Sequence, residues 1–146
     1  DERLVPADDA RSNERMLREV LVAPTQTRFV PLQSGAPRPF DAVVLGMGAD
    51  GHCASLFADG DNIAAALRDD TGVLVMSMCS PSVPEARVTL TLPALVATRA
   101  LFVLIRGADK RRTLESALRG VDPFAQAPIR AVLEHAPVAP QIYWCP

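Results

Sequence analysis

Two short apolar runs, each ended by glycine and followed by residues with helical spacing, constrain the fold of this chain more than any other feature. The first run covers 40–45 and meets Gly46, and the second covers 100–105 and leads to Gly107. Strands that are apolar along most of their length are buried on both sides, as in parallel sheets between helices. The sequence therefore predicts an α/β fold: an open, mostly parallel, Rossmann-like sheet with helices on both faces.

Hydrophobic periodicity indicates the other elements. Helices are expected over 12–22, 62–68, 93–97, 108–119 and 129–133. Extended segments are expected over 28–32, 72–78, 87–92 and 141–145, with a loop rich in glycine and proline over 34–39. Ser12 suits an N-cap, Pro24 is expected to stop the first helix, and Gly120 is expected to end the helix over 108–119.

Composition and charge exclude several classes of function. The 146 residues fit one domain, and 15 Lys and Arg against 17 Asp and Glu leave a formal net charge of −2. Such a chain has no general electrostatic attraction to nucleic acid or to anionic membranes. No apolar stretch approaches the roughly 20 residues of a membrane span, and the charged start lacks the features of a signal peptide. We therefore expect no nucleic-acid partner and no membrane partner.

The three cysteines, Cys53, Cys79 and Cys145, are odd in number and contain no C-x-x-C pair. This usage disfavours a disulfide framework or a structural zinc site and fits the reducing cytosol. A metal site built from Asp50, His52 and Cys53 is also disfavoured, because neighbouring residues seldom point at one ion. We therefore expect a cytoplasmic protein without a bound metal.

The loop over 46–52, Gly-Met-Gly-Ala-Asp-Gly-His, holds the densest group of residues suited to chemistry. Its glycines match G-x-G-x-x-G, the fingerprint of dinucleotide-binding sites. That interpretation is disfavoured, because residues 59–61 interrupt the long helix that such a site needs, and the strand over 73–78 ends without the required carboxylate. Glycines also let backbone N–H groups approach an oxyanion. Asp50 near His52 suits a general base, because a carboxylate can fix the imidazole tautomer. From these residues alone, a turn followed by a histidine at a helix start remains the alternative.

Other candidate residues have weaker support. Ser55 or Cys53 could act as a nucleophile, but the G-x-S-x-G motif is absent and Cys53 has no basic neighbour besides His52. His135 lies at an expected helix end and is interpreted as a surface residue.

Four blocks of this sequence resemble 6-phosphogluconolactonases, in the order in which that family has them. Residues 40–57 resemble the family's active-site signature. The other blocks are 1–6 with the following Ser12-Asn13, 87–95 and 107–110. The signature continues Ser55-Leu56-Phe57, which favours this family over the related amino-sugar-phosphate deaminases and isomerases, whose similar loop continues Phe-Asn-Glu. The resemblance is weak after Lys110.

The resemblance implies hydrolysis of 6-phospho-D-glucono-1,5-lactone to 6-phospho-D-gluconate in the pentose phosphate pathway, without a metal or an organic cofactor. His52 would act as general base on water, Asp50 would orient it, and backbone amides over 46–51 would face the oxyanion. Arg87 and Lys110 would hold the substrate phosphate. The full set that the resemblance implies for substrate binding is Asp1, Arg3, Gly46, Met47, Gly48, Gly51, Arg87 and Lys110.

Two alternatives stay open. A sugar-phosphate isomerase or deaminase could use the same fold. The chain could instead be a catalytically silent sugar-phosphate-binding fragment. The family's first strand and its Gly-rich phosphate loop precede the Asp-Glu-Arg block, and we expect both to be absent from the single domain over 1–146.

Overall fold

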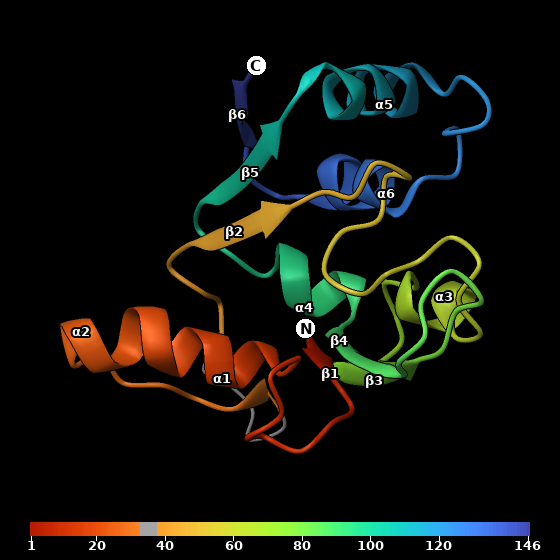
Figure 1. The fold of residues 1–146 in the computed structure, drawn as a ribbon. Coiled ribbons are helices and arrows are strands. Elements are labelled where there is room, and N and C mark those ends of the chain that lie inside the picture. The colour runs from red at the N-terminus through yellow and green to blue at the C-terminus, as the bar shows by residue number, and fades with distance from the viewer. Residues whose placement is uncertain (33–37) are drawn as a thin grey trace.

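The computed structural model describes residues 1–32 and 38–146, and these residues form two three-stranded sheets (Figure 1). The parallel sheet has the order β2–β5–β6 and contains β2 (Val43–Gly46), β5 (Leu101–Arg106) and β6 (Gln141–Cys145). The antiparallel sheet has the order β1–β4–β3 and contains β1 (Glu2–Arg3), β4 (Arg87–Leu90) and β3 (Val75–Met78). Val43 pairs with Leu101 across the parallel sheet. The two apolar runs therefore lie side by side, and the α/β class is confirmed.

The strands expected over 72–78 and 87–92 form the second sheet instead of extending the parallel one. Met78 pairs with Arg87, and Arg87 pairs with Arg3 on its other side. The period-two alternation of polar and apolar residues in β4 is typical of antiparallel strands. The structure thus adds an antiparallel layer next to the expected parallel sheet.

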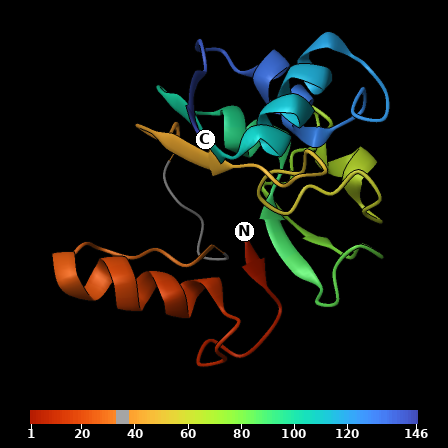
Figure 2. The same cartoon turned by 45° about the horizontal axis from the view of Figure 1, so that its top comes forward.

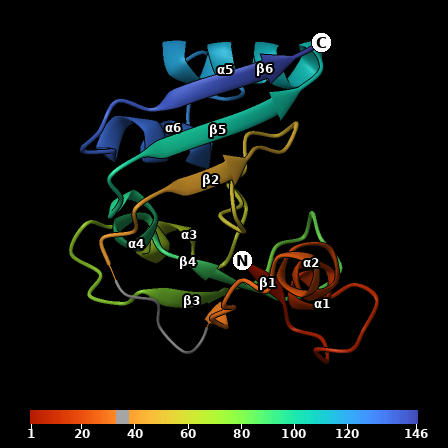
Figure 3. The same ribbon diagram turned by 90° about the vertical axis from the view of Figure 1, so that its left-hand side faces the viewer.

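Helices lie against one face of the parallel sheet (Figure 3). These helices are α4 (Leu92–Val96), α5 (Ala108–Arg119) and α6 (Pro128–His135). Their apolar side chains share one core cluster with Leu101 and Val103 of β5. On the opposite face Val44 is 60% exposed, and Leu104 and Tyr143 are exposed as well. In the part of the chain that the structure describes, helices therefore cover one face, whereas the sequence predicts helices on both.

The N-terminal helical segment lies beside the chain start, away from the parallel sheet (Figure 2). It consists of α1 (Asn13–Leu17), the π-helical η1 (Arg18–Val22) and α2 (Ala23–Thr25). Ser12 caps it as expected, since its Oγ accepts a hydrogen bond from the Arg15 N–H at 3.1 Å. Pro24 does not stop the helix: it lies in the first turn of α2, where its missing N–H is tolerated, and the segment ends at Gln26.

The other expected elements agree with the structure to different degrees. α5 coincides with the helix expected over 108–119 and ends at Gly120, while α6 is longer than 129–133. The helix α3 (Ile63–Ala66) lies within 62–68. Residues 28–32 form no strand, and most of the loop expected over 34–39 is outside the described residues. Among the described helices, none is long and apolar enough to cross a membrane.

Candidate active site

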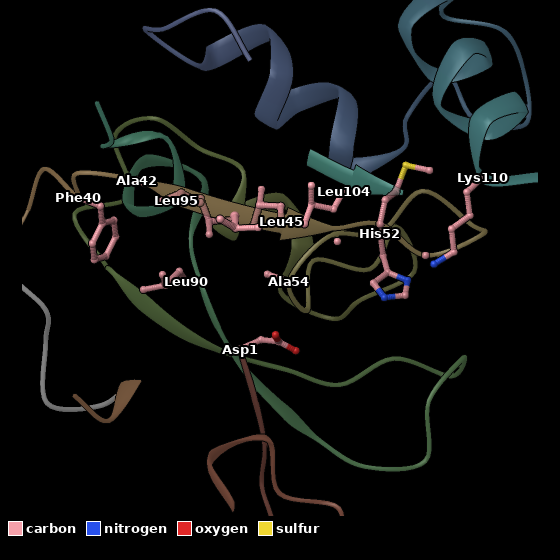
Figure 4. Close-up of a pocket in the computed structure, with 15 residues that line it drawn as sticks. Asp1, Phe40, Ala42, Leu45, His52, Ala54, Leu90, Leu95, Leu104 and Lys110 are labelled. Atoms are coloured by element: carbon pink, nitrogen blue, oxygen red, sulfur yellow. The ribbon is translucent and has the colours of Figure 1, made fainter. Parts of the chain in front are cut away.

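A cavity of about 640 Å³ runs along β2 to the loop at its carboxyl end (Figure 4). His52 from this loop, Lys110 from the first turn of α5 and Asp1 from the chain start supply its charged and titratable side chains. Leu90 and Leu95 line its apolar part. Open α/β sheets bind ligands where strands end and helices begin, so this cavity is the candidate active site.

His52 and Asp50 form a hydrogen-bonded pair in the loop. The distance from Nδ1 of His52 to Oδ1 of Asp50 is 2.7 Å. Because a carboxylate accepts hydrogen bonds, this contact assigns the imidazole proton to Nδ1 and leaves the lone pair on Nε2. Phe57 packs beside the imidazole with 4.7 Å between ring centroids. No described protein group forms a hydrogen bond with Nε2, so its lone pair is available as a base.

Two glycines shape the loop around this pair. A Cβ atom at Gly48 would overlap with Nδ1 of His52 and Oδ1 of Asp50, so only glycine leaves room for their hydrogen bond. Gly51 has a φ of +84°, which L-residues rarely adopt. The N–H of Gly48 donates to the His52 carbonyl at 2.9 Å, and the N–H of Gly51 donates to the Gly48 carbonyl at 3.1 Å. Both of these N–H groups are thus engaged within the loop, and the oxyanion role expected of the amides over 46–51 stays a prediction.

Two hydrogen bonds fasten the loop to the helices behind the sheet. Oγ1 of Thr113, in α5, donates to the carbonyl of Ala49 at 2.9 Å. The N–H of Ile129, in the first turn of α6, donates to the carbonyl of Gly51 at 3.1 Å. The residues that precede His52 are thus fixed by elements distant in sequence.

Lys110 brings an uncompensated positive charge to the cavity. Its neighbours Arg111 and Arg112 form ion pairs with Glu115 and Asp109 on the surface of α5. No such pair involves Lys110 within the described ranges, although it lines the cavity together with His52. A cation in the first turn of a helix gains nothing from the helix dipole, so stability does not explain its position.

Comparison with known proteins identifies the family. The family model described as glucosamine-6-phosphate isomerases/6-phosphogluconolactonase matches residues 25–144. The chain belongs to this family. A 6-phosphogluconolactonase from Mesorhizobium japonicum is 37% identical over an alignment of 165 residues, which covers 100% of this chain and 68% of the relative. One from Rhizobium meliloti is 36% identical, with 100% and 71% covered.

Solved structures of the same family agree. The crystal structure of a 6-phosphogluconolactonase from Shewanella baltica is 31% identical and has a TM-score of 0.82. The match covers 99% of this chain and 69% of the Shewanella chain. The resemblance noted from the sequence blocks is therefore confirmed at the level of the family and the fold.

The structure places the two family-block arginines outside the cavity lining. Arg3 uses Nη1 to donate to the carbonyl of Arg11 at 2.8 Å and to Oδ1 of Asn13 at 2.6 Å. This nitrogen of Arg3 therefore ties the start of the chain to the beginning of α1.

Arg87 is buried, with 8% of its surface exposed. Its Nε has no hydrogen-bond partner among the described residues, and its Nη2 lies 4.0 Å from Oε2 of Glu85. Burial and the nearby Arg3 guanidinium lower the pKa of Arg87 from its usual value. Strand alternation places Arg87 on the same face of β4 as Thr89, whose Oγ1 accepts a hydrogen bond from the N–H of Ser55. Arg87 thus shares a sheet face with a residue that contacts the signature segment.

Sequence reasoning missed two parts of the site. Leu90, Leu95 and Leu104 line the cavity from three different elements, and only the tertiary fold brings them together. The sequence suggests Ser55 only as a candidate nucleophile, yet its hydroxyl donates to Oδ2 of Asp1 at 2.7 Å. No cluster of three metal-ligating side chains is found in the described ranges.

Proposed function

We propose that this chain hydrolyses 6-phospho-D-glucono-1,5-lactone to 6-phospho-D-gluconate, with His52 as the general base. The observation that carries the proposal is the His52–Asp50 pair. Nδ1 lies 2.7 Å from a carboxylate, and Nε2, which has no hydrogen-bond partner among the described residues, lies beside a cavity that Lys110 also lines. The names of the relatives support this substrate, and the free thiols of all three cysteines fit a reaction in the cytosol.

His52 handles the proton in both halves of the reaction. Nε2 accepts a proton from water as the water oxygen attacks the lactone carbonyl and forms a tetrahedral intermediate. The bond to the ring oxygen then breaks, and the imidazolium returns the proton to the leaving alkoxide. Such proton transfer contributes typically 10²- to 10⁴-fold, or about 3–5 kcal/mol of the barrier. Asp50 keeps the proton on Nδ1 and stabilises the imidazolium that forms between the two steps.

Two cations supply the positive charge that a phosphate dianion needs. Within the described ranges Lys110, which lines the cavity, forms no ion pair, and the buried Arg87 guanidinium has no hydrogen-bond partner for its Nε. A buried charge without a full set of partners is costly unless a ligand provides them. Arg3 adds positive charge next to Arg87, with which it pairs across the strands. We assign the phosphate to this group of basic residues.

The remaining site residues would bind the sugar or shape the loop. Gly46, Met47 and Gly48 line the cavity without bulky polar side chains and let the lactone approach the backbone. Asp1 would accept hydrogen bonds from ring hydroxyls. Gly51 does not line the cavity, so its contribution is the turn that presents His52.

The test is lactone hydrolysis by the 146-residue chain, measured against buffer because δ-lactones also open spontaneously. We expect a rate above buffer that falls by about 10²- to 10⁴-fold in His52→Ala. The matched control is His135→Ala on α6, whose Nδ1 contacts a helix carbonyl and which should leave the rate unchanged. An unchanged rate in His52→Ala would exclude His52 as the base.

The substrate charge offers a second test. Lys110→Ala should raise KM for the phosphorylated lactone by about tenfold or more, with little effect on the unphosphorylated lactone, since one charge-assisted contact is lost. Arg112→Ala is the control, because Arg112 pairs with Asp109 on the surface. Equal effects on both lactones would contradict the phosphate assignment. Conversion of an amino-sugar phosphate would favour a sugar-phosphate isomerase or deaminase. Saturable 6-phosphogluconate binding without turnover would favour a catalytically silent sugar-phosphate-binding fragment.

A further inference from the structure

We infer that Ser55 is a positioning residue, which holds the Asp1 carboxylate in the cavity so that Asp1 selects a polyhydroxylated ring and orients it. The inference rests on the proposed function, because it concerns the same cavity. It adds a residue that lies outside the His52–Asp50 pair and does not line the cavity itself.

Ser55 is held from both sides. It is 1% exposed, and its N–H donates to Oγ1 of Thr89 at 3.2 Å. Thr89 is fully buried, and its own hydroxyl donates to the carbonyl of Leu90 at 3.1 Å. The Ser55 hydroxyl in turn donates to Oδ2 of Asp1 at 2.7 Å. The chain of hydrogen bonds therefore joins the signature segment to the antiparallel sheet and ends on a carboxylate in the cavity.

The backbone before Ser55 sets the direction of its hydroxyl. Ala54 has a φ of +50°, which is uncommon for a residue with a side chain. The N–H of Leu56 donates to the carbonyl of Cys53 at 3.0 Å and closes a turn over 53–56. In this turn Ala54 lines the cavity, while Ser55 contacts Asp1 and Thr89.

The resulting cavity is polarised. In Figure 4 the imidazole of His52 lies between the carboxylate of Asp1 and the side chain of Lys110. A carboxylate accepts hydrogen bonds from hydroxyl groups and repels phosphate, while an ammonium attracts phosphate. A ligand with one anionic end and several hydroxyls is thus oriented with its phosphate toward Lys110 and its hydroxyls toward Asp1. A ring held in this orientation lies beside the His52 imidazole, because the imidazole lies between the two groups.

The experiment compares two ligands, 6-phosphogluconate and inorganic phosphate, by calorimetric titration of the whole chain. Ser55→Ala should weaken 6-phosphogluconate binding by about 3- to 10-fold and leave phosphate binding unchanged, because only the hydroxyl contacts depend on Asp1. In Asp1→Asn the same selective loss is expected, and adding Ser55→Ala to it should have no further effect. In turnover, Ser55→Ala should raise KM with little change in kcat.

Ser82→Ala is the matched control, because Ser82 also donates its hydroxyl to an aspartate, Asp59, but does so away from the cavity. It should bind both ligands like the parent. If Ser55→Ala does not fold, as judged by its thermal transition, Asp1→Asn still tests the inference. Parent-like 6-phosphogluconate binding by Asp1→Asn, an equal loss for both ligands in Ser55→Ala, or additive effects in the double variant would each overturn it. Failure of the parent to bind 6-phosphogluconate would instead overturn the proposed function, and this inference with it.

Discussion

At the scale of single residues, Gly48 is a position where a side chain would overlap with the His52–Asp50 pair. The His52–Asp50 hydrogen bond occupies the space that a Cβ would need. Gly48→Ala should therefore displace the imidazole and lower kcat by about 10²-fold, as misplacement of a reacting group by about 1 Å does. Steady-state kinetics provide the measurement.

Gly72→Ala separates this effect from general strain. Gly72 has a φ of +61°, no atom of the described residues lies within 4 Å of its Cβ position, and it does not line the cavity. Its substitution should cost about 1–2 kcal/mol of stability and leave kcat unchanged. A Gly48→Ala chain with the kcat of the parent would show that the pair can rearrange without loss.

What the sequence predicts at this scale depends on separation along the chain. Asp50 and His52 are two residues apart in a turn, so local spacing suffices to predict their contact, and the structure has it. Ser55 and Asp1 are 54 positions apart, and their hydrogen bond exists only because β1 pairs with β4. No local pattern could have pointed to Ser55 as a positioning residue.

At the scale of elements, Glu2 determines how α1 begins. Its carboxylate accepts hydrogen bonds from the N–H groups of Asn13 at 2.8 Å and Glu14 at 2.6 Å. Burial raises the pKa of Glu2, but hydrogen bonds from the backbone of Glu14, Asn13 and Arg3 and from the Ser12 hydroxyl outweigh it, so the pKa lies below its usual 4.5. Glu2→Gln should reduce the free energy of unfolding by about 1–2 kcal/mol at neutral pH.

The sign of the pH dependence follows from the lowered pKa. Glu2 stabilises the folded state fully above its unfolded pKa, and this contribution disappears as pH falls through the folded value. Urea unfolding should therefore separate Glu2→Gln from the parent at about pH 7 and bring them together as the pH falls below 4.5 and through the folded pKa. Glu19→Gln, which removes only an exposed pair with Arg15, should cost about 0.3–0.5 kcal/mol. A Glu2→Gln difference that is constant with pH would contradict the capping role.

Elements with local end signals are the ones that the sequence predicts well. α5 has its expected bounds because Gly107 precedes it and Gly120 follows it. The sequence does not predict the antiparallel sheet, because β1 has only two residues and its partner β4 is more than eighty positions away. The π-helical turn that precedes Pro24 has no local signal either.

At the scale of the whole molecule, the cavity exists because the signature segment bridges the two sheets. The loop after β2 is tied to α5 and α6 through the carbonyls of Ala49 and Gly51. A few residues later, Ser55 is hydrogen-bonded to Asp1, which precedes β1, and to Thr89 of β4. Both halves of the site therefore depend on the same stretch of chain, and movement of one sheet against the other would alter the distance between His52 and Asp1.

The reaction rate of the Cys53 thiol measures how often the signature segment opens to solvent. Cys53 lies in the signature segment and is 1% exposed, and burial raises the pKa of its thiol to about 12, whereas Cys79 and Cys145 are exposed. Because the thiolate is the reactive form, we expect Cys79 and Cys145 to react readily with an aromatic disulfide reagent in the native protein. Cys53 should react only after the segment around it opens locally. The progress curve of the reagent at about pH 8 gives the two rates. Cys79→Ser should reduce the fast thiols from two to one.

The ligand connects this measurement to function. If 6-phosphogluconate binds the closed molecule, saturating ligand should slow the reaction of Cys53 by the factor 1 + [L]/Kd, or about a hundredfold at 100 times Kd, and leave the exposed thiols unaffected. Ser55→Ala should reduce this protection, because its weaker binding lowers [L]/Kd at the same ligand concentration. Three thiols that react at one rate in the native protein would show instead that the segment around His52 is open to solvent and does not bridge the sheets.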